Sequence, residues 1–247
     1  DAMLDVYWSG TVTRISPEAP VPIVKINSED YTVGGAANVA TNLAGLGATP
    51  ILCGVIGDDA SGRMVQSLCL QAGLPSDALI VTPGRPTTTK TRVIGNNQHI
   101  ARLDHETKEH VSDDVTNAIV GQLASYSDLR GIVLEDYDKG LLSPLLIRTV
   151  IDIARERAIP VFVDPKHRHF FDFTGCTVFK PNKKEASDAL GMQLNTPLEI
   201  ERAGHALLTT LKCDNVLITF GAAGMMLIEK DGTLNSVPTR SMNVADV

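Results

Sequence analysis

The sequence predicts an α/β protein with a doubly wound, mostly parallel sheet and a small β flap or lid. Short apolar runs typical of buried strands alternate along the chain with longer segments of helical periodicity. Two β-rich segments, at about residues 10–30 and 86–104, stand outside that alternation because prolines or turn residues interrupt them. The 247 residues are 43% hydrophobic and can bury one large core. We therefore expect one domain over residues 1–247 with a small lid.

Composition excludes several classes of protein. A net charge of −7 argues against a general nucleic-acid-binding surface. The four cysteines are widely spaced and match no zinc pattern, and a disulfide framework is not expected in a chain of this length. No charged-then-apolar leader opens the chain, and no apolar run approaches the roughly twenty residues that a membrane span needs. We expect a soluble cytoplasmic protein with neither nucleic-acid nor membrane partners.

The elements of the first half follow from periodicity and from the residues that end each run. Prolines at 17, 20 and 22 confine the first expected strand to an edge or a flap. Turn chemistry at Gly95-Asn96-Asn97 predicts the tip of a hairpin. The expected elements are a strand at 21–27, a helix ending at Gly47, a strand at 50–56, a helix at 59–72, hairpin strands at 87–94 and 99–104, and a helix at 113–125.

The second half repeats strand and helix and closes with a hairpin. Ser143-Pro144 opens a helix, and Thr196-Pro197-Leu198-Glu199 is a capping box for another that reaches about Leu211. The expected strands lie at 131–134, 160–163, 177–179, 215–219, 225–229 and 233–237. The last two form an antiparallel edge on an otherwise parallel sheet.

The stretch from Val33 to Ala40 is the strongest local signal. Gly34 and Gly35 stand before an apolar helical run, so main chain could be open to a ligand there, and Asn38 falls in the first turn with a donor and an acceptor. That combination suits hydroxyl groups better than phosphate, and neither the dinucleotide fingerprint nor the P-loop is present. Paired glycines before a helix are also common where they only form the turn between two elements.

Charged residues follow several expected strands. Asp136 ends a buried strand, and Lys139 and Lys166 lie in loops after successive strands, where they could bind an anionic group or remain solvated. Arg102 on the hairpin is a third candidate. Thr219 leads into a turn bounded by Gly221 and Gly224, which fits a nucleotide contact or plain hairpin chemistry.

These motifs carry a family resemblance. Gly34-Gly35-Ala36-Ala37-Asn38 followed by Leu43-Ala44-Gly45-Leu46-Gly47 resembles the first signature of the ribokinase/PfkB sugar kinases. Residues 1–8 and 14–24 resemble one branch, the D-glycero-β-D-manno-heptose-7-phosphate kinases, either the kinase domain of the bifunctional heptose kinase/adenylyltransferase or its single-domain counterpart. The resemblance runs over nearly the whole chain and implies a ribokinase-like fold.

The resemblance also implies roles for residues. Asp5 corresponds to the family's sugar-binding aspartate, although a turn or N-cap aspartate is the structural alternative. Asn182-Lys183-Lys184-Glu185 resembles the family's Asn-x-x-Glu motif, whose Glu organises Mg²⁺ and nucleotide phosphate through water; Glu185 could instead be only a favourable first-turn charge. Taken together, the expected substrate residues are Asp5, Gly34, Gly35, Asn38, Arg102, Asp136, Lys139 and Lys166, with either Lys139 or Lys166 on the 7-phosphate. The expected nucleotide residues are Asn182, Lys183, Lys184, Glu185, Thr219, Gly221 and Gly224.

The family's catalytic Gly-Ala-Gly-Asp motif is expected just after Val247, and an apolar first strand is expected before Asp1; neither is among these residues. We therefore expect these 247 residues alone to show little kinase activity. The implied reaction is transfer of the ATP γ-phosphoryl group, with Mg²⁺, to C1 of heptose 7-phosphate by a homodimer. The alternatives are a fructokinase-like member of the family and a non-catalytic sugar-phosphate-binding module.

Overall fold

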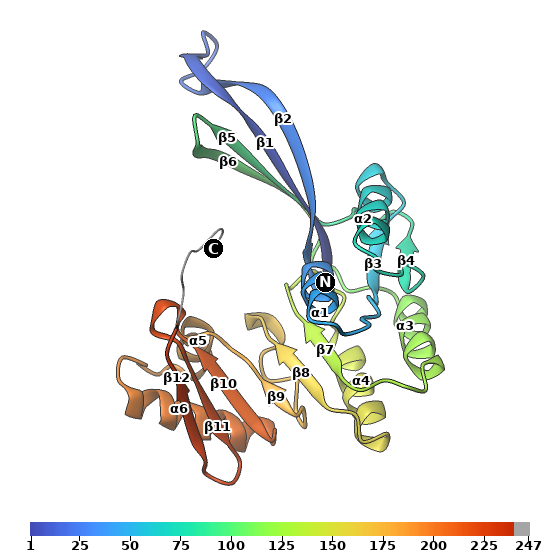
Figure 1. Ribbon diagram of the computed structural model, residues 1–247, viewed down its shortest axis with the longest axis vertical. Helices are drawn as coiled ribbons and strands as arrows, with labels where there is room; N and C mark the ends of the chain where they lie inside the picture. Colours follow the sequence, from blue (N-terminus) through green and yellow to red (C-terminus); the bar gives the residue numbers. More distant parts are fainter. Residues whose placement is uncertain (240–247) are drawn as a thin grey trace. The chain divides into compact units, whose positions relative to one another are not determined.

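The computed structural model describes residues 1–239 and divides the chain into two compact units. The first comprises Asp1–Ile119 with Lys139–Leu141, and the second comprises Val120–Asp138 and the residues from Leu142 onward. Asn243 to Val247, which resemble the approach to the catalytic motif, lie outside the described residues. Figure 1 shows the elements in chain order.

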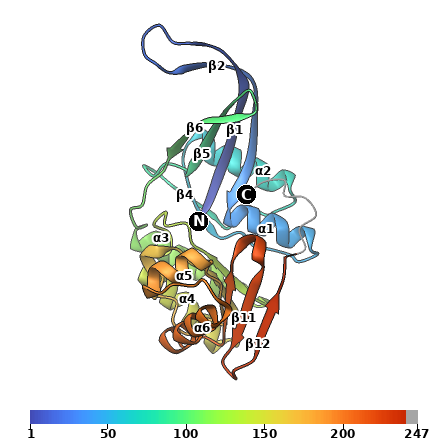
Figure 2. The ribbon, with the colours of Figure 1, turned by 90° about the vertical axis from the view of Figure 1, so that its left-hand side faces the viewer.

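A four-stranded sheet dominates the first unit. Its order is β2-β1-β5-β6, with β1 (Ala2–Ile15) antiparallel to β2 (Pro22–Gly35) and parallel to β5 (Thr89–Gly95), which forms a hairpin with β6 (Gln98–His105). These strands extend away from the unit's helices (Figures 1 and 2). The β5–β6 hairpin with Asn96 and Asn97 at its tip confirms the turn chemistry. The β1–β2 hairpin is longer than the flap expected at 10–30, because both strands continue into the core of the unit.

The two faces of β1 have different chemistry because side chains alternate along a strand. Leu4 and Val6 are buried in a hydrophobic cluster with residues of α1 (Ala36–Gly45) and α2 (Ala60–Gln71), and Trp8 packs against its edge. Asp5 and Tyr7 therefore lie on the opposite face. A two-stranded parallel sheet, β3 (Gly54–Gly57) with β4 (Leu79–Thr82), completes the unit. The strand expected at 50–56 is regular only near its end, and β4 was not predicted.

The second unit contains the predicted parallel sheet with its antiparallel edge. The order is β12-β11-β10-β9-β8-β7, in which the four strands β7 to β10 are parallel and the β11–β12 hairpin is antiparallel. The strands are β7 (Ile132–Glu135), β8 (Val161–Asp164), β9 (Val178–Phe179), β10 (Asn215–Thr219), β11 (Met225–Glu229) and β12 (Leu234–Val237). Phe179 is fully buried and meets Phe170 edge to face with ring centroids 5.0 Å apart.

Helices line one face of this sheet (Figure 2). They are α4 (Pro144–Glu156), α5 (Lys183–Leu190) and α6 (Pro197–Leu211). A further helix, α3 (Asp113–Ser125), has the bounds that the sequence predicted. Ser143 caps α4 by accepting from the Leu146 N–H, and Thr196 with Glu199 forms the predicted capping box of α6. None of the helices within residues 1–239 combines the length and apolar composition required to cross a membrane.

Candidate active site

The paired glycines end a strand as well as begin a helix. Gly34 is the last but one residue of β2 and lies opposite Met3, while Gly35 has a φ of 58° and precedes the first turn of α1. A Cβ at Gly34 would collide with the Asp5 carboxylate. The Gly34 main chain is therefore buried beneath Asp5 and Met3, whereas the sequence suggested main chain open to a ligand. Asn38 lies in the first turn of α1, as predicted, and is exposed.

Arg92 orients the Asp5 carboxylate. The Nη1 atom of Arg92 lies 2.5 Å from Oδ1 of Asp5, with side-chain exposures of 25% and 16%. The guanidinium group also lies 5.1 Å from the centre of the Tyr7 ring. Oδ2 of Asp5 lies over Gly34, so both carboxylate oxygens have defined positions. Sequence analysis missed Arg92, although the alternation of Lys90 and Arg92 on one expected strand was a usable signal.

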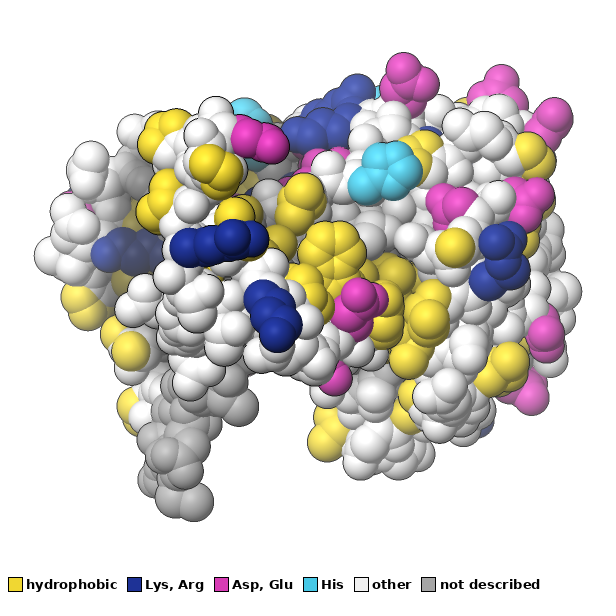
Figure 3. Space-filling model, turned by 90° about the horizontal axis from the view of Figure 1, so that it is seen from above, with side chains coloured by type: hydrophobic (Ala, Val, Ile, Leu, Met, Phe, Trp, Pro, Cys, Tyr) yellow, Lys and Arg dark blue, Asp and Glu magenta, His cyan; other side chains and the backbone are white. Residues whose placement is uncertain are grey.

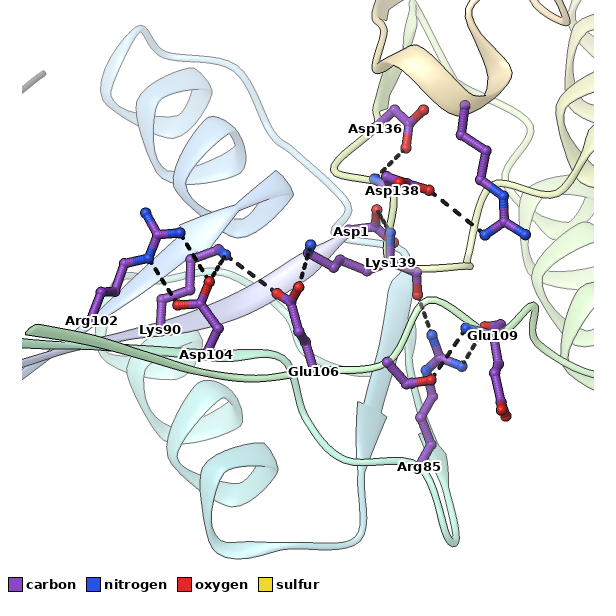
Figure 4. Close-up of polar contacts among 12 residues, drawn as sticks. Asp1, Arg85, Lys90, Arg102, Asp104, Glu106, Glu109, Asp136, Asp138 and Lys139 are labelled. Atoms are coloured by element: carbon purple, nitrogen blue, oxygen red, sulfur yellow. Dashed lines mark hydrogen bonds and ion pairs between the residues drawn. The ribbon is translucent and has the colours of Figure 1, made fainter.

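The backbone of Lys139 is held on both sides (Figure 4). Its N–H donates to Oδ2 of Asp1 at 3.1 Å, and its carbonyl accepts from the Arg85 guanidinium, which also donates to the Glu109 carbonyl at 3.0 Å. Burial lowers the pKa of Arg85, and the charge of Glu109 opposes this shift. The Lys139 Nζ donates to Glu106 at 2.9 Å. Lys139 is therefore a buried, fixed cation rather than a solvated loop lysine.

Arg102 pairs with a carboxylate on its own strand. Its Nε and Nη2 atoms donate to the two oxygens of Asp104 at 2.9 and 3.0 Å, and its side chain is 60% exposed. This bidentate contact is the first cause of the lowered pKa of Asp104, and Lys90 acts in the same direction.

Carboxylates gather at the carboxyl ends of β7 and β8 in the second unit. Glu135 lies opposite Asp164 in the parallel register. Burial raises the pKa of Glu135 to about 7, the neighbouring charge of Asp164 acts in the same direction, and Lys180 opposes it. Lys180 Nζ lies 2.7 Å from Asp164.

Asp136 holds two loops of the second unit together. Its Oδ1 atom accepts from the Asp138 N–H at 2.8 Å, and its Oδ2 atom accepts from the Lys166 N–H at 3.3 Å. The residue is 2% exposed. These contacts give the carboxylate a structural task that is independent of any substrate.

Lys166 contacts the Asn-x-x-Glu motif. Its Nζ donates to Oε1 of Glu185 at 2.6 Å and lies 5.7 Å from the centre of the Tyr137 ring. Burial alone would lower the pKa of Lys166, but the hydrogen bond and charge of Glu185 outweigh burial and raise it. The structure thus brings a lysine assigned to the sugar phosphate together with the residue assigned to magnesium.

The motif itself is a capping box at the start of α5. Asn182 accepts from the Glu185 N–H at 2.9 Å, and Oε2 of Glu185 accepts from the Asn182 N–H at 2.8 Å. Both Glu185 oxygens are therefore engaged, so the residue fits the outer hydration shell of Mg²⁺ better than direct ligation. Within residues 1–239 no group of three or more His, Cys, Asp and Glu side chains is placed to hold a metal ion.

The remaining nucleotide candidates lie around β10. Asn182 and Thr219 form a parallel bridge, and the Thr219 N–H donates to the Pro181 carbonyl at 3.1 Å. Gly221 and Gly224 have φ values of 60° and 107° and bound a short 3-10 turn, as the glycine spacing predicted. Lys184 extends into solvent and pairs with Asp188, whereas Lys183 is half-buried.

Comparison with known proteins defines the family. The model of the pfkB family carbohydrate kinases matches residues 1–247. A bifunctional protein HldE from Geobacter sulfurreducens is 39% identical over 248 residues, covering 100% of this chain and 51% of the relative, and HldE from Wolinella succinogenes is 36% identical with coverages of 100% and 52%. The chain spans about half the length of these curated relatives.

Solved structures share the fold at lower identity. Phosphofructokinase-2 from Escherichia coli superposes with a TM-score of 0.78 at 18% identity, covering 98% of this chain and 78% of that one. A ribokinase from Arabidopsis thaliana, solved with ribose and ATP, gives a TM-score of 0.73 at 20% identity, with coverages of 100% and 77%. These matches confirm the ribokinase-like α/β fold. The match of the family model over residues 1–247 shows that the chain belongs to the pfkB family of carbohydrate kinases.

Proposed function

We propose that this chain is the kinase part of an enzyme that transfers the γ-phosphoryl group of ATP to C1 of D-glycero-β-D-manno-heptose 7-phosphate. The product would be the 1,7-bisphosphate, used to make ADP-heptose for lipopolysaccharide core synthesis. The family match and the HldE relatives support a sugar kinase, and the two N-terminal segments support the heptose branch. The structural observation that carries the proposal is the Asp5 carboxylate, held by Arg92 above Gly34.

The first unit supplies groups suited to a sugar phosphate. A carboxylate with fixed oxygens can accept hydrogen bonds from two vicinal hydroxyls, and the exposed Asn38 amide in the first turn of α1 can both donate and accept. We assign Asp5 and Asn38 to the sugar, with Gly34 leaving the space that the Asp5 carboxylate occupies and Gly35 preceding the first turn of α1. Lys139 is assigned to the phosphate of the sugar, with Arg102 as an outer cation. In the second unit Lys166 is assigned to the anionic charge of the substrates, and Asp136 fixes its loop.

The nucleotide is assigned to residues of the second unit, namely Asn182, Lys183, Lys184, Glu185, Thr219, Gly221 and Gly224. Phosphoryl transfer depends mainly on alignment and on stabilisation of charge. Mg²⁺ bound with ATP would neutralise phosphate charge, and Glu185 would orient its water ligands. The general base is assigned to the Gly-Ala-Gly-Asp motif that we expect after Val247.

Asn38→Ala tests the sugar assignment. It should weaken binding of heptose 7-phosphate by roughly tenfold, since one hydrogen-bonding side chain to a buried hydroxyl is worth about 1–1.5 kcal/mol, while ATP binding stays unchanged. Titration calorimetry with each ligand measures both affinities. An equal loss of the two affinities would contradict the assignment.

A substrate panel separates the alternatives. Heptose 7-phosphate, unphosphorylated heptose and fructose should be compared with ATP in a protein that continues through the expected Gly-Ala-Gly-Asp motif. Turnover restricted to heptose 7-phosphate supports the proposal, whereas preference for fructose indicates the fructokinase-like alternative. Binding without turnover of any sugar indicates the non-catalytic module.

We further propose a cytoplasmic homodimer that pairs through the lid strands. Large apolar side chains are exposed on these strands or directly beside them, with Ile15 at 60%, Val21 at 51% and Leu103 at 52%. Hydrophobic side chains also lie at the surface among basic ones in the view from above (Figure 3). Such exposure on extended strands is typical of an interaction surface.

A further inference from the structure

A row of alternating charges runs from the polar face of the first unit's sheet to the loop that bears Lys139 (Figure 4). Lys139 lies 2.9 Å from Glu106, Glu106 lies 3.3 Å from Lys90, and Lys90 lies 3.4 Å from Asp104, which Arg102 holds from the outer side. The row thus contains three cations and two carboxylates. Two lysines converge on the single carboxylate of Glu106, so the inner end of the row carries an excess positive charge.

The inner end of the row is also its most buried part. Side-chain exposure is 11% for Lys139, 16% for Lys90 and 19% for Glu106. Burial works against the ionised form of Glu106, but its hydrogen bond to Lys139 and the charges of both lysines outweigh burial and lower its pKa. The Glu106 carboxylate and the two lysines thus meet in a partly desolvated site, where charge interactions are stronger than in water.

The backbone of Lys139 is held independently of Glu106. Its backbone is fixed by Asp1 and Arg85, and the next residue, Gly140, has a φ of 82° and contacts the Glu109 backbone so closely that a Cβ would not fit. The lysine ammonium is consequently delivered to this position by the loop.

The row adjoins the proposed sugar contacts. Lys90 is the register partner of Asp5 across β1 and β5, and of Asp104 across β5 and β6. Side chains of register partners lie on the same face of a sheet about 5 Å apart. A sugar held by Asp5 therefore has Lys90 next to it, and Lys90 shares Glu106 with Lys139.

We propose that Lys90 and Lys139 form the binding site for the substrate's phosphate group, and that Glu106 is a resident counter-ion which this phosphate displaces. The inference rests on the proposed function and assigns its phosphate to a lysine pair of the first unit. A phosphate dianion has more charge and more acceptor oxygens than the carboxylate it replaces, so it can satisfy both ammonium groups at once. An uncharged sugar cannot displace Glu106 from the two lysines, because it offers them no negative charge in exchange.

The proposal predicts opposite changes in phosphate affinity for variants of the lysine pair and for variants of the counter-ion. Lys90→Met should weaken binding of heptose 7-phosphate, and of inorganic phosphate used as a probe, by roughly tenfold, because one charged hydrogen bond is lost. Glu106→Gln should tighten binding of both by roughly three- to tenfold, because the competing charge is removed. Calorimetric titration without ATP measures these changes. Lys25→Met and Glu29→Gln, two exposed positions on β2, serve as matched controls and should leave both affinities unchanged.

The outcomes separate this inference from the proposed function. Weaker phosphate binding in Glu106→Gln would overturn the counter-ion role, and unchanged binding in Lys90→Met would overturn the lysine pair. Phosphoryl transfer to heptose 7-phosphate with unchanged affinities in both variants refutes only the present inference; tight binding without transfer refutes only the proposed function. Melting temperatures identify variants that fail to fold, and Lys90→Gln and Glu106→Ala, which also remove the charges, then repeat the test with different changes in shape.

Discussion

At the scale of single residues, Gly34 shows how a site can require the absence of a side chain. The Asp5 carboxylate occupies the space that a Cβ at Gly34 would need, and Arg92 prevents the carboxylate from moving aside freely. Asp5 lies on β1 and Arg92 lies on β5, and hydrogen bonds fix the register of these strands. A small change in volume should therefore displace the group that we assign to the sugar.

Gly34→Ala should lower the affinity for heptose 7-phosphate by at least about tenfold and destabilise the fold by ~1–3 kcal/mol, as overpacking of a tight site does. Gly45→Ala is the matched control, because Gly45 belongs to α1 and a Cβ there meets nothing within 4 Å. It should leave affinity unchanged and stabilise the protein by up to ~1 kcal/mol. Equal effects of the two changes on affinity would show that Gly34 has no special steric role.

Glu135 makes stability depend on pH near neutrality. Its pKa is raised to about 7 in the folded protein by burial and by Asp164, so between about pH 4.5 and 7 the folded state binds more protons than the unfolded state. Stability should accordingly fall as pH rises through this window, by an amount on the order of 1–3 kcal/mol. Asp104 and Glu106, whose pKa values are lowered, act oppositely and at more acidic pH, where stability is lost as pH falls.

Urea denaturation at half-unit steps between pH 4.5 and 8 measures this dependence. Glu135→Gln should flatten it across the window, because the group that titrates there is removed. A slope that persists unchanged in the variant would assign the titration to another residue.

At the scale of elements, α5 and α6 begin with the same motif but differ in their surroundings. Asn182 and Thr196 each form a capping box with a Glu three residues later. Only the first cap adjoins Thr219, through a parallel bridge, and Lys166, through Glu185. Comparing variants of the two helix starts can therefore separate an effect on stability from an effect on ligand binding.

Asn182→Ala and Thr196→Ala should each cost about 1 kcal/mol of stability, the usual effect of losing an N-cap side chain. Asn182→Ala should also weaken ATP binding by roughly five- to tenfold, because the first turn of α5, which bears Glu185 and adjoins Thr219, loses its order. Thr196→Ala should bind ATP normally. If the two variants bind ATP equally well, the Asn-x-x-Glu segment is only a helix start.

At the scale of the whole molecule, the lid strands expose more apolar surface than a solvated hairpin needs. Ile15 ends β1 and Val21 directly precedes β2, so both lie near the tip of the β1–β2 hairpin. The side chains of both residues are more than half exposed. If two copies pair through these strands, the apolar area is buried and the dimer gains about 25 cal/mol for each Å² removed from water.

Light scattering should give the mass of a dimer for the unchanged protein. The double change Ile15→Lys with Val21→Lys should shift it to the monomer without lowering the melting temperature, since neither residue belongs to the core. A monomeric mass for the unchanged protein would contradict the dimer proposal.

Several elements could be predicted from local chemistry alone. The bounds of α3 and β10 and the caps of α4 and α6 followed from periodicity and from Ser143 and Thr196, because these signals act over a few residues. The long strand β1 was not predicted, since Asp5, Ser9 and Gly10 interrupt its apolar pattern. Strand β4 was missed because four residues are too few for a periodic signal.

The candidate site was predicted less completely than the fold. Asp5, Asn38 and Lys139 were named, but Asp1, Lys90, Arg92 and Glu106 were not, because their significance depends on partners 14 to 138 residues away. Lys166 was named for the sugar phosphate, but its contact with Glu185, which is 19 positions further along the chain, could not be anticipated from the sequence.

The amino-acid sequence by itself determined the fold class, the family and the glycine-bounded turns, because each depends on residue types at short, fixed spacings. The tertiary structure alone decided that Asp5 covers Gly34 under the control of Arg92, and that Lys90 and Lys139 share Glu106. The reason is physical: strand register and loop closure bring charges together across long stretches of chain, and their interaction depends on distance and burial rather than on their order in the sequence.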